Sequence, residues 1–299
     1  MPAKPIQLLS ATFLEQLERL SLMARRPVRG WAAGQRRSRQ AGHSVEFLDY
    51  RAYGTGDDLR YVDWNIFRRT DRLVVKQFVD DEELSLHLLV DASGSMSAVP
   101  GKYDTSKLEW ATRLAAALGF IGLAGLERVG LGVVRDRVSE GWAPSRGRGR
   151  VTPLMNFLGD VKSGGTTRLN ESLAAYAARA RGSGVAVVIS DLMDEAGYEA
   201  GLRALLERRF EVHVVHVLSP EEMQPSISGD LRLVDAETGE ARTVHIDAET
   251  LRAYRERLAE FLVRAERFCI SQSIGYHRVT SDQPLEDVVL GPLRGRLLA

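Results

Sequence analysis

The sequence is poor in cysteine and carries no excess of either charge. Cys269 is the one cysteine among 299 residues. A single cysteine cannot form an intrachain disulfide and offers no framework for a structural zinc site. Such a composition is typical of proteins in reducing compartments. Lys plus Arg and Asp plus Glu each number 40, and this balance argues against bulk nucleic acid or a membrane surface as the main binding partner.

Long hydrophobic runs are also missing. No stretch approaches the roughly 18 uncharged apolar residues of a membrane span, and the first residues lack the apolar core of a signal peptide. We therefore expect a protein without a membrane span, located in the cytoplasm. The sequence has no Gly-x-x-x-x-Gly-Lys-Ser/Thr segment, which predicts that this chain is not itself a P-loop ATPase.

Short apolar runs alternate with helical patterns between residues 82 and 220. The runs predict strands at residues 84–90, 129–134, 185–189 and 212–218, and the helical spacing predicts helices at 106–127, 169–180 and 198–209. Uninterrupted Val, Ile and Leu runs are typical of strands that are buried on both faces of a parallel sheet. The predicted fold class is therefore α/β, with a doubly wound, mostly parallel sheet over residues 82–220.

Two further parts flank this predicted domain. Residues 1–81 should hold an N-terminal helix at 8–24, a basic loop and a small β-rich extension. Residues 221–299 should hold a hairpin at 231–246, a long helix that begins at Asp247, and a final strand, all packed on the same body.

Oxygen-bearing side chains follow the first predicted strand of the domain. Asp91, Ser93 and Ser95 alternate directly after the run that ends at residue 90. In an extended segment, residues two apart point to the same side, so one carboxylate and two hydroxyls can converge. In open α/β sheets, ligands bind at the carboxyl ends of the strands. Hard oxygens are the ligands that Mg²⁺ prefers, and three are too few for a closed cage.

Two other segments can supply the missing ligands. Thr166 and Thr167 follow two glycines before a predicted helix, and Asp191 follows the apolar run 185–189 in the same way that Asp91 follows its own run. Either threonine offers a hydroxyl; we favour Thr166 by its place after Gly165. Both segments converge on Asp91 if their strands are neighbours.

In this order, the three segments resemble the metal-ion-dependent adhesion site of von Willebrand factor A domains. The resemblance implies that Asp91, Ser93, Ser95, Thr166 and Asp191 bind Mg²⁺, or alternatively Mn²⁺ or Ca²⁺, directly or through water. It also implies an open coordination position that is filled by an acidic side chain of a protein partner. The sequence departs from the common pattern at Leu192, where glycine is frequent, and Asp194 is a competing ligand.

A second resemblance covers residues 42 to the C-terminus. The sequence is similar to the bacterial domain of unknown function family 58 at Glu46-Phe47, Arg51-Ala52-Tyr53, Gly56-Asp57-Asp58, Arg60 and Asp63-Trp64. Members carry the A-type domain and are often linked to MoxR-type AAA+ ATPases, in chaperone-like or metal-centre maturation roles. This resemblance implies a metal-dependent protein-interaction module, an adaptor of such an ATPase, that is not an enzyme.

Two alternative functions remain open. A magnesium-dependent hydrolase of phosphate esters would use the same cation to activate water, with Asp194 or His43 as its base, although nothing in the sequence places either residue there. A nucleic-acid binder would use the basic cluster around Trp31, which consists of Arg25, Arg26, Arg29, Arg36, Arg37 and Arg39; zero net charge argues against it. For the carboxylates Asp57, Asp58 and Asp63, we favour an ion-paired structural loop over acid–base chemistry.

Overall fold

The structure, a computed structural model, describes residues 8–24, 47–54, 57, 59–78, 85–97, 105–125, 127–136, 138–180, 184–294 and 297. These residues belong to two compact units. The larger unit contains helix α1 (Ala11–Ala24) and everything from strand β3 (Ser85–Asp91) onward, and the smaller one contains strands β1 (Phe47–Ala52) and β2 (Val74–Phe78). The predicted N-terminal part, residues 1–81, is thus divided between the two units.

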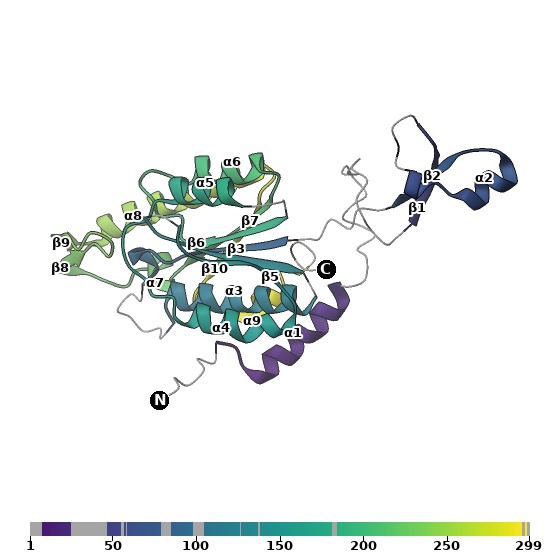
Figure 1. Ribbon diagram of the computed structural model, residues 1–299. Coiled ribbons are helices and arrows are strands. Elements are labelled where there is room, and N and C mark those ends of the chain that lie inside the picture. The colour runs from purple at the N-terminus through teal and green to yellow at the C-terminus, as the bar shows by residue number, and fades with distance from the viewer. Residues whose placement is uncertain are drawn as a thin grey trace. The chain divides into compact units, whose positions relative to one another are not determined.

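The larger unit is built on one six-stranded sheet (Figure 1). Besides β3, its strands are β4 (Arg128–Val134), β5 (Val138–Arg146), β6 (Val185–Ser190), β7 (Glu211–Leu218) and β10 (Gly275–Thr280). Their order is β10-β7-β6-β3-β4-β5, and only β5, at one edge, runs antiparallel to its neighbour. The chain order reverses between β3 and β6, as in doubly wound sheets. The predicted fold class is confirmed.

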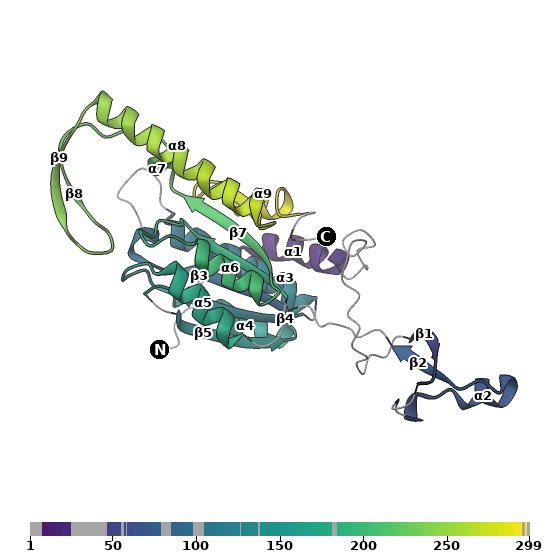
Figure 2. The same ribbon diagram turned by 90° about the horizontal axis from the view of Figure 1, so that it is seen from above.

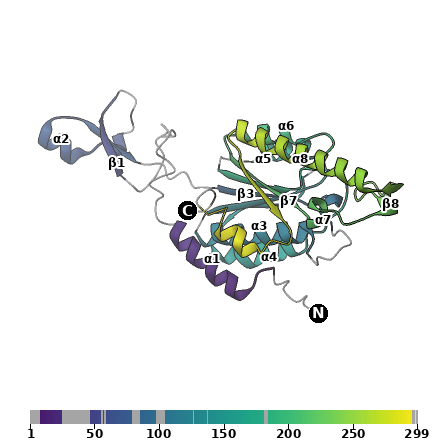
Figure 3. The same ribbon diagram turned by 180° about the vertical axis from the view of Figure 1, so that it is seen from behind.

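Helices cover both faces of this sheet. One face carries α1, α3 (Lys107–Ala124), α4 (Val151–Gly159) and α9 (Leu285–Leu290), and the other carries α5 (Leu169–Arg179), α6 (Glu199–Glu207) and α8 (Ala248–Ser271), as Figures 1 and 3 show. Alternate side chains of β3 enter two separate cores, because Leu88 and Val90 pack on the first face and Leu89 packs on the second. Burial on both faces explains why the central strands are uninterrupted apolar runs.

Helix α3 lies close against the sheet. Ser106 caps its start, since the Ser106 side chain accepts a hydrogen bond from the Glu109 backbone at 3.0 Å. Gly122 permits the close approach, since a Cβ there would lie 2.7 Å from a Val129 methyl carbon of β4, and Gly119 permits close packing on α4, since a Cβ there would lie 2.5 Å from a Leu154 methyl carbon. The start of α3 lies at the carboxyl edge of the sheet, where Lys107 contacts Asp191 directly after β6.

A hairpin and a long helix follow β7 (Figure 2). After the short helix α7 (Pro220–Met223), strands β8 (Gly229–Val234) and β9 (Ala241–Ile246) form an antiparallel ribbon, and α8 then leads to β10. Asp247 caps α8 by accepting a hydrogen bond from the Thr250 backbone at 2.8 Å. The structure therefore contains the predicted hairpin, long helix and final strand, and the last of these joins the central sheet.

Strand β5 was not predicted. Arg146 ends this strand, and Arg148 and Arg150 follow in the exposed 3-10 turn η3 (Arg148–Arg150). The sequence of β5 lacks an apolar run because β5 is an edge strand: it pairs only with β4, and Pro144 is tolerated there since an edge leaves one side of the backbone unpaired.

The smaller unit is held by local ion pairs and caps. Strands β1 and β2 pair antiparallel around the turn η1 (Leu59–Tyr61) and helix α2 (Trp64–Thr70). Arg51 binds both oxygens of Asp57 at 2.6 Å, which lowers the pKa of Asp57 to about 2. Asp63 caps α2 and lies 3.2 Å from the Lys76 ammonium. Both carboxylates thus serve the fold, as the sequence predicted; Asp58 lies outside the described residues.

Within the described segments of both units, no helix has the length and apolar character that crossing a membrane requires.

Candidate cation site at the carboxyl edge of the sheet

The candidate site begins where β3 ends. Asp91 is buried, and its Oδ1 accepts a hydrogen bond from the Ser93 backbone at 3.0 Å, which turns the chain into the short 3-10 segment η2 (Gly94–Met96). The turn brings the Ser93 and Ser95 hydroxyl oxygens to 2.9 Å from each other. The predicted alternation of Asp91, Ser93 and Ser95 therefore places three oxygen-bearing side chains at one loop.

The glycine-threonine loop lies against this turn. The Gly94 backbone N–H donates to the Gly165 carbonyl, and the Gly164 N–H donates to the Ala92 carbonyl, both at 2.9 Å. Gly164 and Gly165 have φ values of 152° and 77°, a region that side-chain-bearing residues rarely adopt. This backbone path leaves Thr166 exposed and buries Thr167, which is 6% exposed.

Strand β6 brings its terminal residues beside Asp91. Strands β3 and β6 are parallel neighbours, so the condition for convergence of the two strand ends is met. The Ser190 hydroxyl donates to Asp91 Oδ2 at 2.6 Å, and it accepts a hydrogen bond from the Leu192 backbone at 2.9 Å. Burial, and secondly the negative charge of Asp191, raise the pKa of Asp91 to about 7, against the opposing hydrogen bonds from Ser190 and Ser93.

Asp191 is held by a buried lysine. The Lys107 ammonium, at the first position of α3, donates to Asp191 Oδ2 at 2.7 Å and also pairs with Glu222 of α7. Lys107 is 1% exposed and Asp191 is fully buried. Burial alone would lower the pKa of Lys107, but the charges of Asp191 and Glu222 outweigh it, and the pKa is raised. Asp191 Oδ1 accepts a hydrogen bond from the Met193 backbone at 3.0 Å.

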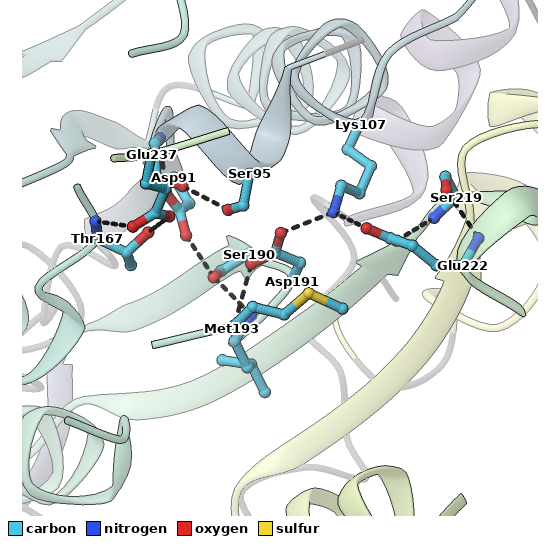
Figure 4. A network of polar contacts seen from close by, with 12 residues as sticks. Asp91, Ser95, Lys107, Thr167, Ser190, Asp191, Met193, Ser219, Glu222 and Glu237 are labelled. Atoms are coloured by element: carbon cyan, nitrogen blue, oxygen red, sulfur yellow. Dashed lines mark hydrogen bonds and ion pairs between the residues drawn. The ribbon is translucent and has the colours of Figure 1, made fainter. Parts of the chain in front are cut away.

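The tip of the β8–β9 hairpin reaches the same site. Glu237 Oε2 accepts a hydrogen bond from the Thr167 backbone at 2.9 Å, and Oε1 accepts one from the Thr167 hydroxyl at 2.5 Å. The tip also sits tightly on the turn after β3, because a Cβ at Gly94 would lie 2.3 Å from the Ala236 carbonyl oxygen and 3.0 Å from the Cα of Glu237. Figure 4 shows Glu237, Thr167, Asp91 and Ser95 at one end of the polar network, and Lys107 and Glu222 at the other.

The donor set of this site suits a hard divalent cation. It consists of one buried carboxylate and three hydroxyls, with a second carboxylate from Glu237, and all of these groups offer oxygen. Two oxygens bound at right angles to a Mg²⁺ ion lie about 3 Å apart, and the Ser93 and Ser95 oxygens are 2.9 Å apart. Nowhere in the described part of the chain do three His, Cys, Asp or Glu side chains form a metal-binding group, so a cation here would depend on the hydroxyls.

Other residues singled out in the sequence lie elsewhere. Both oxygens of Asp194 accept backbone hydrogen bonds, from Leu169 at 2.6 Å and from Ala196 at 2.8 Å, so Asp194 fixes the start of α5. His43 and the arginines between residues 25 and 39 lie outside the described residues. Cys269 is buried in the core, and burial raises its thiol pKa to about 12.

Sequence reasoning missed Lys107, Glu222 and Glu237. A lysine at the start of a mostly apolar helix was a signal for the first. The Ser219-x-x-Glu222 spacing is a capping box, which the structure contains, and it could have indicated the second. Glu237 carried no signal, because its contact with Thr167 joins residues that are 70 positions apart.

The fold and the strand-end loops define an α/β protein with a polar site at its topological switch point. A family model described as "Protein of unknown function DUF58" matches residues 49–262. The chain belongs to this family, as the sequence predicted. An uncharacterized protein of Mycobacterium tuberculosis is 30% identical over 235 residues, which cover 77% of this chain and 73% of that protein. An uncharacterized protein of Mycobacterium bovis matches with the same values.

Several solved structures are similar in part. A conserved hypothetical protein BatB from Bacteroides thetaiotaomicron is 15% identical, with a TM-score of 0.41 over 69% of this chain and 95% of that one. An aerotolerance-related membrane protein from Bacteroides fragilis is 17% identical, with a TM-score of 0.40 over 69% and 94%. The SpRpn10 VWA domain is 16% identical, with a TM-score of 0.37 over 70% and 96%.

Proposed function

We propose that the larger unit is a von Willebrand factor A-like protein-interaction module that captures an acidic side chain of a partner through a divalent cation. Asp91, Ser93, Ser95 and Thr167 would hold the ion, which is Mg²⁺, Mn²⁺ or Ca²⁺. The supporting observation is that one buried carboxylate and three hydroxyls from two adjoining loops gather at the carboxyl edge of the sheet. We place Thr167 in the role first given to Thr166, because Thr167 is the buried one of the two.

The remaining residues would set the charge and orientation of the site. When bound, the cation would supply a positive centre for the partner's carboxylate. Ser190 and the Ser93 backbone orient Asp91 through hydrogen bonds to its two oxygens. Asp191 would act through water, since Lys107 and the Met193 backbone already bind its oxygens. Asp194, one of the two bases considered for a hydrolase beside His43, is engaged by backbone donors, and this supports capture over hydrolysis.

Membership of the DUF58 family supports a more specific role. The partner would be a MoxR-type AAA+ ATPase, and the chain would act as its adaptor in chaperone-like work or in the maturation of metal centres. The partner would offer an Asp or Glu side chain to the cation.

Titration calorimetry with MnCl₂ tests the cation site. We expect the unaltered protein to bind one Mn²⁺ and Asp91→Ala to bind none, because the substitution removes the one carboxylate of the β3 loop. Ser95→Ala should weaken binding without removing that charge. Asp160→Ala, an exposed carboxylate at the end of α4, is the matched control and should bind normally. Equal Mn²⁺ binding by Asp91→Ala and Asp160→Ala would refute the site.

Capture of a purified MoxR-type ATPase, with and without EDTA, tests the partner. We expect capture by the unaltered protein and by Asp160→Ala, and its loss with EDTA or with Asp91→Ala. Capture that survives both chelation and Asp91→Ala would reject the metal-dependent interaction.

A further inference from the structure

The hairpin β8–β9 is exposed along most of its length but not at one tip residue. Asp235, Ala236, Thr238, Gly239 and Glu240 are exposed, whereas the Glu237 side chain between them is half-buried. Hydrogen bonds fix the backbone of the turn around Glu237: Asp235 Oδ1 accepts one from the backbone of Glu237 at 2.9 Å and one from that of Thr238 at 2.7 Å. The tip therefore offers a single carboxylate to the body of the larger unit.

This carboxylate lies where the proposed function requires one from a partner. The Glu237 carboxylate accepts hydrogen bonds from the backbone and the hydroxyl of Thr167. The Glu237 Cα packs on Gly94, which lies between the two serines of the β3 loop. Figure 4 shows Asp91 and Glu237 at the same end of the polar network. Among the described residues drawn in this network, the cation is Lys107, which is bound to Asp191 and Glu222. A divalent ion held by Asp91 would attract the Glu237 carboxylate.

We propose that Glu237 is an internal ligand of the cation site, an inference that rests on the proposed function. Its carboxylate occupies the position that a partner's acidic side chain would take, so the hairpin holds the site closed. A partner binds by displacing the tip. The hairpin suits this role because a two-stranded ribbon with few buried side chains is marginally stable by itself, and its outer end is held to the body by Glu237 and the contact at Gly94.

Hydrogen–deuterium exchange provides the first test. We expect Mn²⁺ to slow exchange of the amides of residues 231–246 in the unaltered protein, because the cation binds the tip. Glu237→Gln should exchange faster there and should not respond to Mn²⁺. Glu240→Gln, on the same turn, is the matched control, since the Glu240 side chain points to Arg242. A purely structural contact would give the same exchange with and without Mn²⁺, and that result would overturn the inference.

A peptide with the sequence of the tip, Leu-Val-Asp-Ala-Glu-Thr-Gly-Glu-Ala-Arg (residues 233–242), provides the second test. In the presence of Mn²⁺ it should bind Glu237→Gln at least about tenfold more tightly than the unaltered protein, because a closed site weakens apparent affinity by the fraction of molecules that are open. The same peptide with Gln in place of its first Glu should not bind. Equal binding to both proteins, or no binding to Glu237→Gln, would overturn the inference.

The experiments distinguish an error in the cation site from an error in the assignment of Glu237 as its internal ligand. If Asp91→Ala abolishes Mn²⁺ binding but Glu237→Gln behaves like Glu240→Gln in both tests, the cation site stands and the internal ligand is wrong. If Asp91→Ala binds Mn²⁺ normally, the proposed function itself is wrong.

Discussion

Leu192 adopts a backbone conformation that suits glycine. Its φ is 57°, in the left-handed region, and its side chain is 1% exposed within the core beneath α5 and α6. An L-residue in this region costs about 1–2 kcal/mol relative to the ordinary conformation. The strain is offset by burial of the leucine, and the backbone N–H is fixed by the Ser190 hydroxyl. This explains why a position where glycine is frequent can hold leucine here.

At position 192 we therefore expect the glycine variant to be more stable than the alanine variant, the reverse of the usual order for these two residues. Both Leu192→Ala and Leu192→Gly should lose about 2–5 kcal/mol, because each removes a buried side chain. The glycine variant should nevertheless be the more stable by about 1 kcal/mol, since only glycine relieves the left-handed strain. Urea denaturation of the three proteins measures the difference. An alanine variant as stable as the glycine variant would contradict the strain.

At this scale, prediction from sequence worked where the geometry is local. The alternation of Asp91, Ser93 and Ser95 is a property of five consecutive residues, and the structure brings them together. The choice between Thr166 and Thr167 was not local, because the φ values of Gly164 and Gly165 decide which threonine turns inward. A sequence states that glycine permits such values but not which of them the chain adopts.

At the scale of elements, Lys107 joins three parts of the larger unit. Its ammonium links the start of α3 to the end of β6 through Asp191, and to α7 through Glu222. The Asp191 carboxylate is fully buried, and that of Glu222 is 18% exposed. A buried charge that loses its partner keeps the full penalty of desolvation. The pair with Asp191 therefore holds the loop after β6 in place beside the candidate site.

Replacing this lysine should destabilise the fold strongly. We expect Lys107→Met to lower the free energy of unfolding by about 3–5 kcal/mol, because it leaves the buried Asp191 carboxylate unpaired. Lys162→Met, at an exposed position, is the control and should change it by no more than about 0.5 kcal/mol. Urea denaturation at neutral pH compares them. Similar stability of the two variants would contradict a stabilising role for the Lys107–Asp191 ion pair.

The central strands, buried on both faces, were predictable, whereas the edge strand β5 and the short helix α9 were not. The strands β3, β4, β6 and β7 are apolar along nearly their whole length, so their sequences have no other interpretation. Strand β5 mixes Glu140, Gly141 and Pro144 with apolar residues because it lies at the sheet edge. Helix α9 has six residues, too few for a helical period to be recognised.

At the scale of the whole molecule, the N-terminal helix completes a core that is formed mostly by residues far along the chain. Phe13 and Leu17 of α1 are fully buried in the cluster that contains α3, α4 and the first face of the sheet. The Arg113 side chain of α3 also donates to the Leu8 carbonyl at 3.1 Å. The sequence predicted the helix itself but grouped it with residues up to 81, because helical spacing identifies an apolar face and not the surface that covers it.

Loss of this long-range packing should destabilise the larger unit. We expect Phe13→Ala to lower the free energy of unfolding by about 3–5 kcal/mol, since it removes a large buried side chain from a core that cannot fully collapse around the cavity. Gln16→Ala, on the exposed side of α1, should change it by no more than about 0.5 kcal/mol. Circular dichroism during urea denaturation measures both. If α1 is an integral part of the larger unit, the single transition of that unit shifts with Phe13→Ala, whereas equal midpoints for the two variants would mean that the sheet and its candidate site are stable without α1.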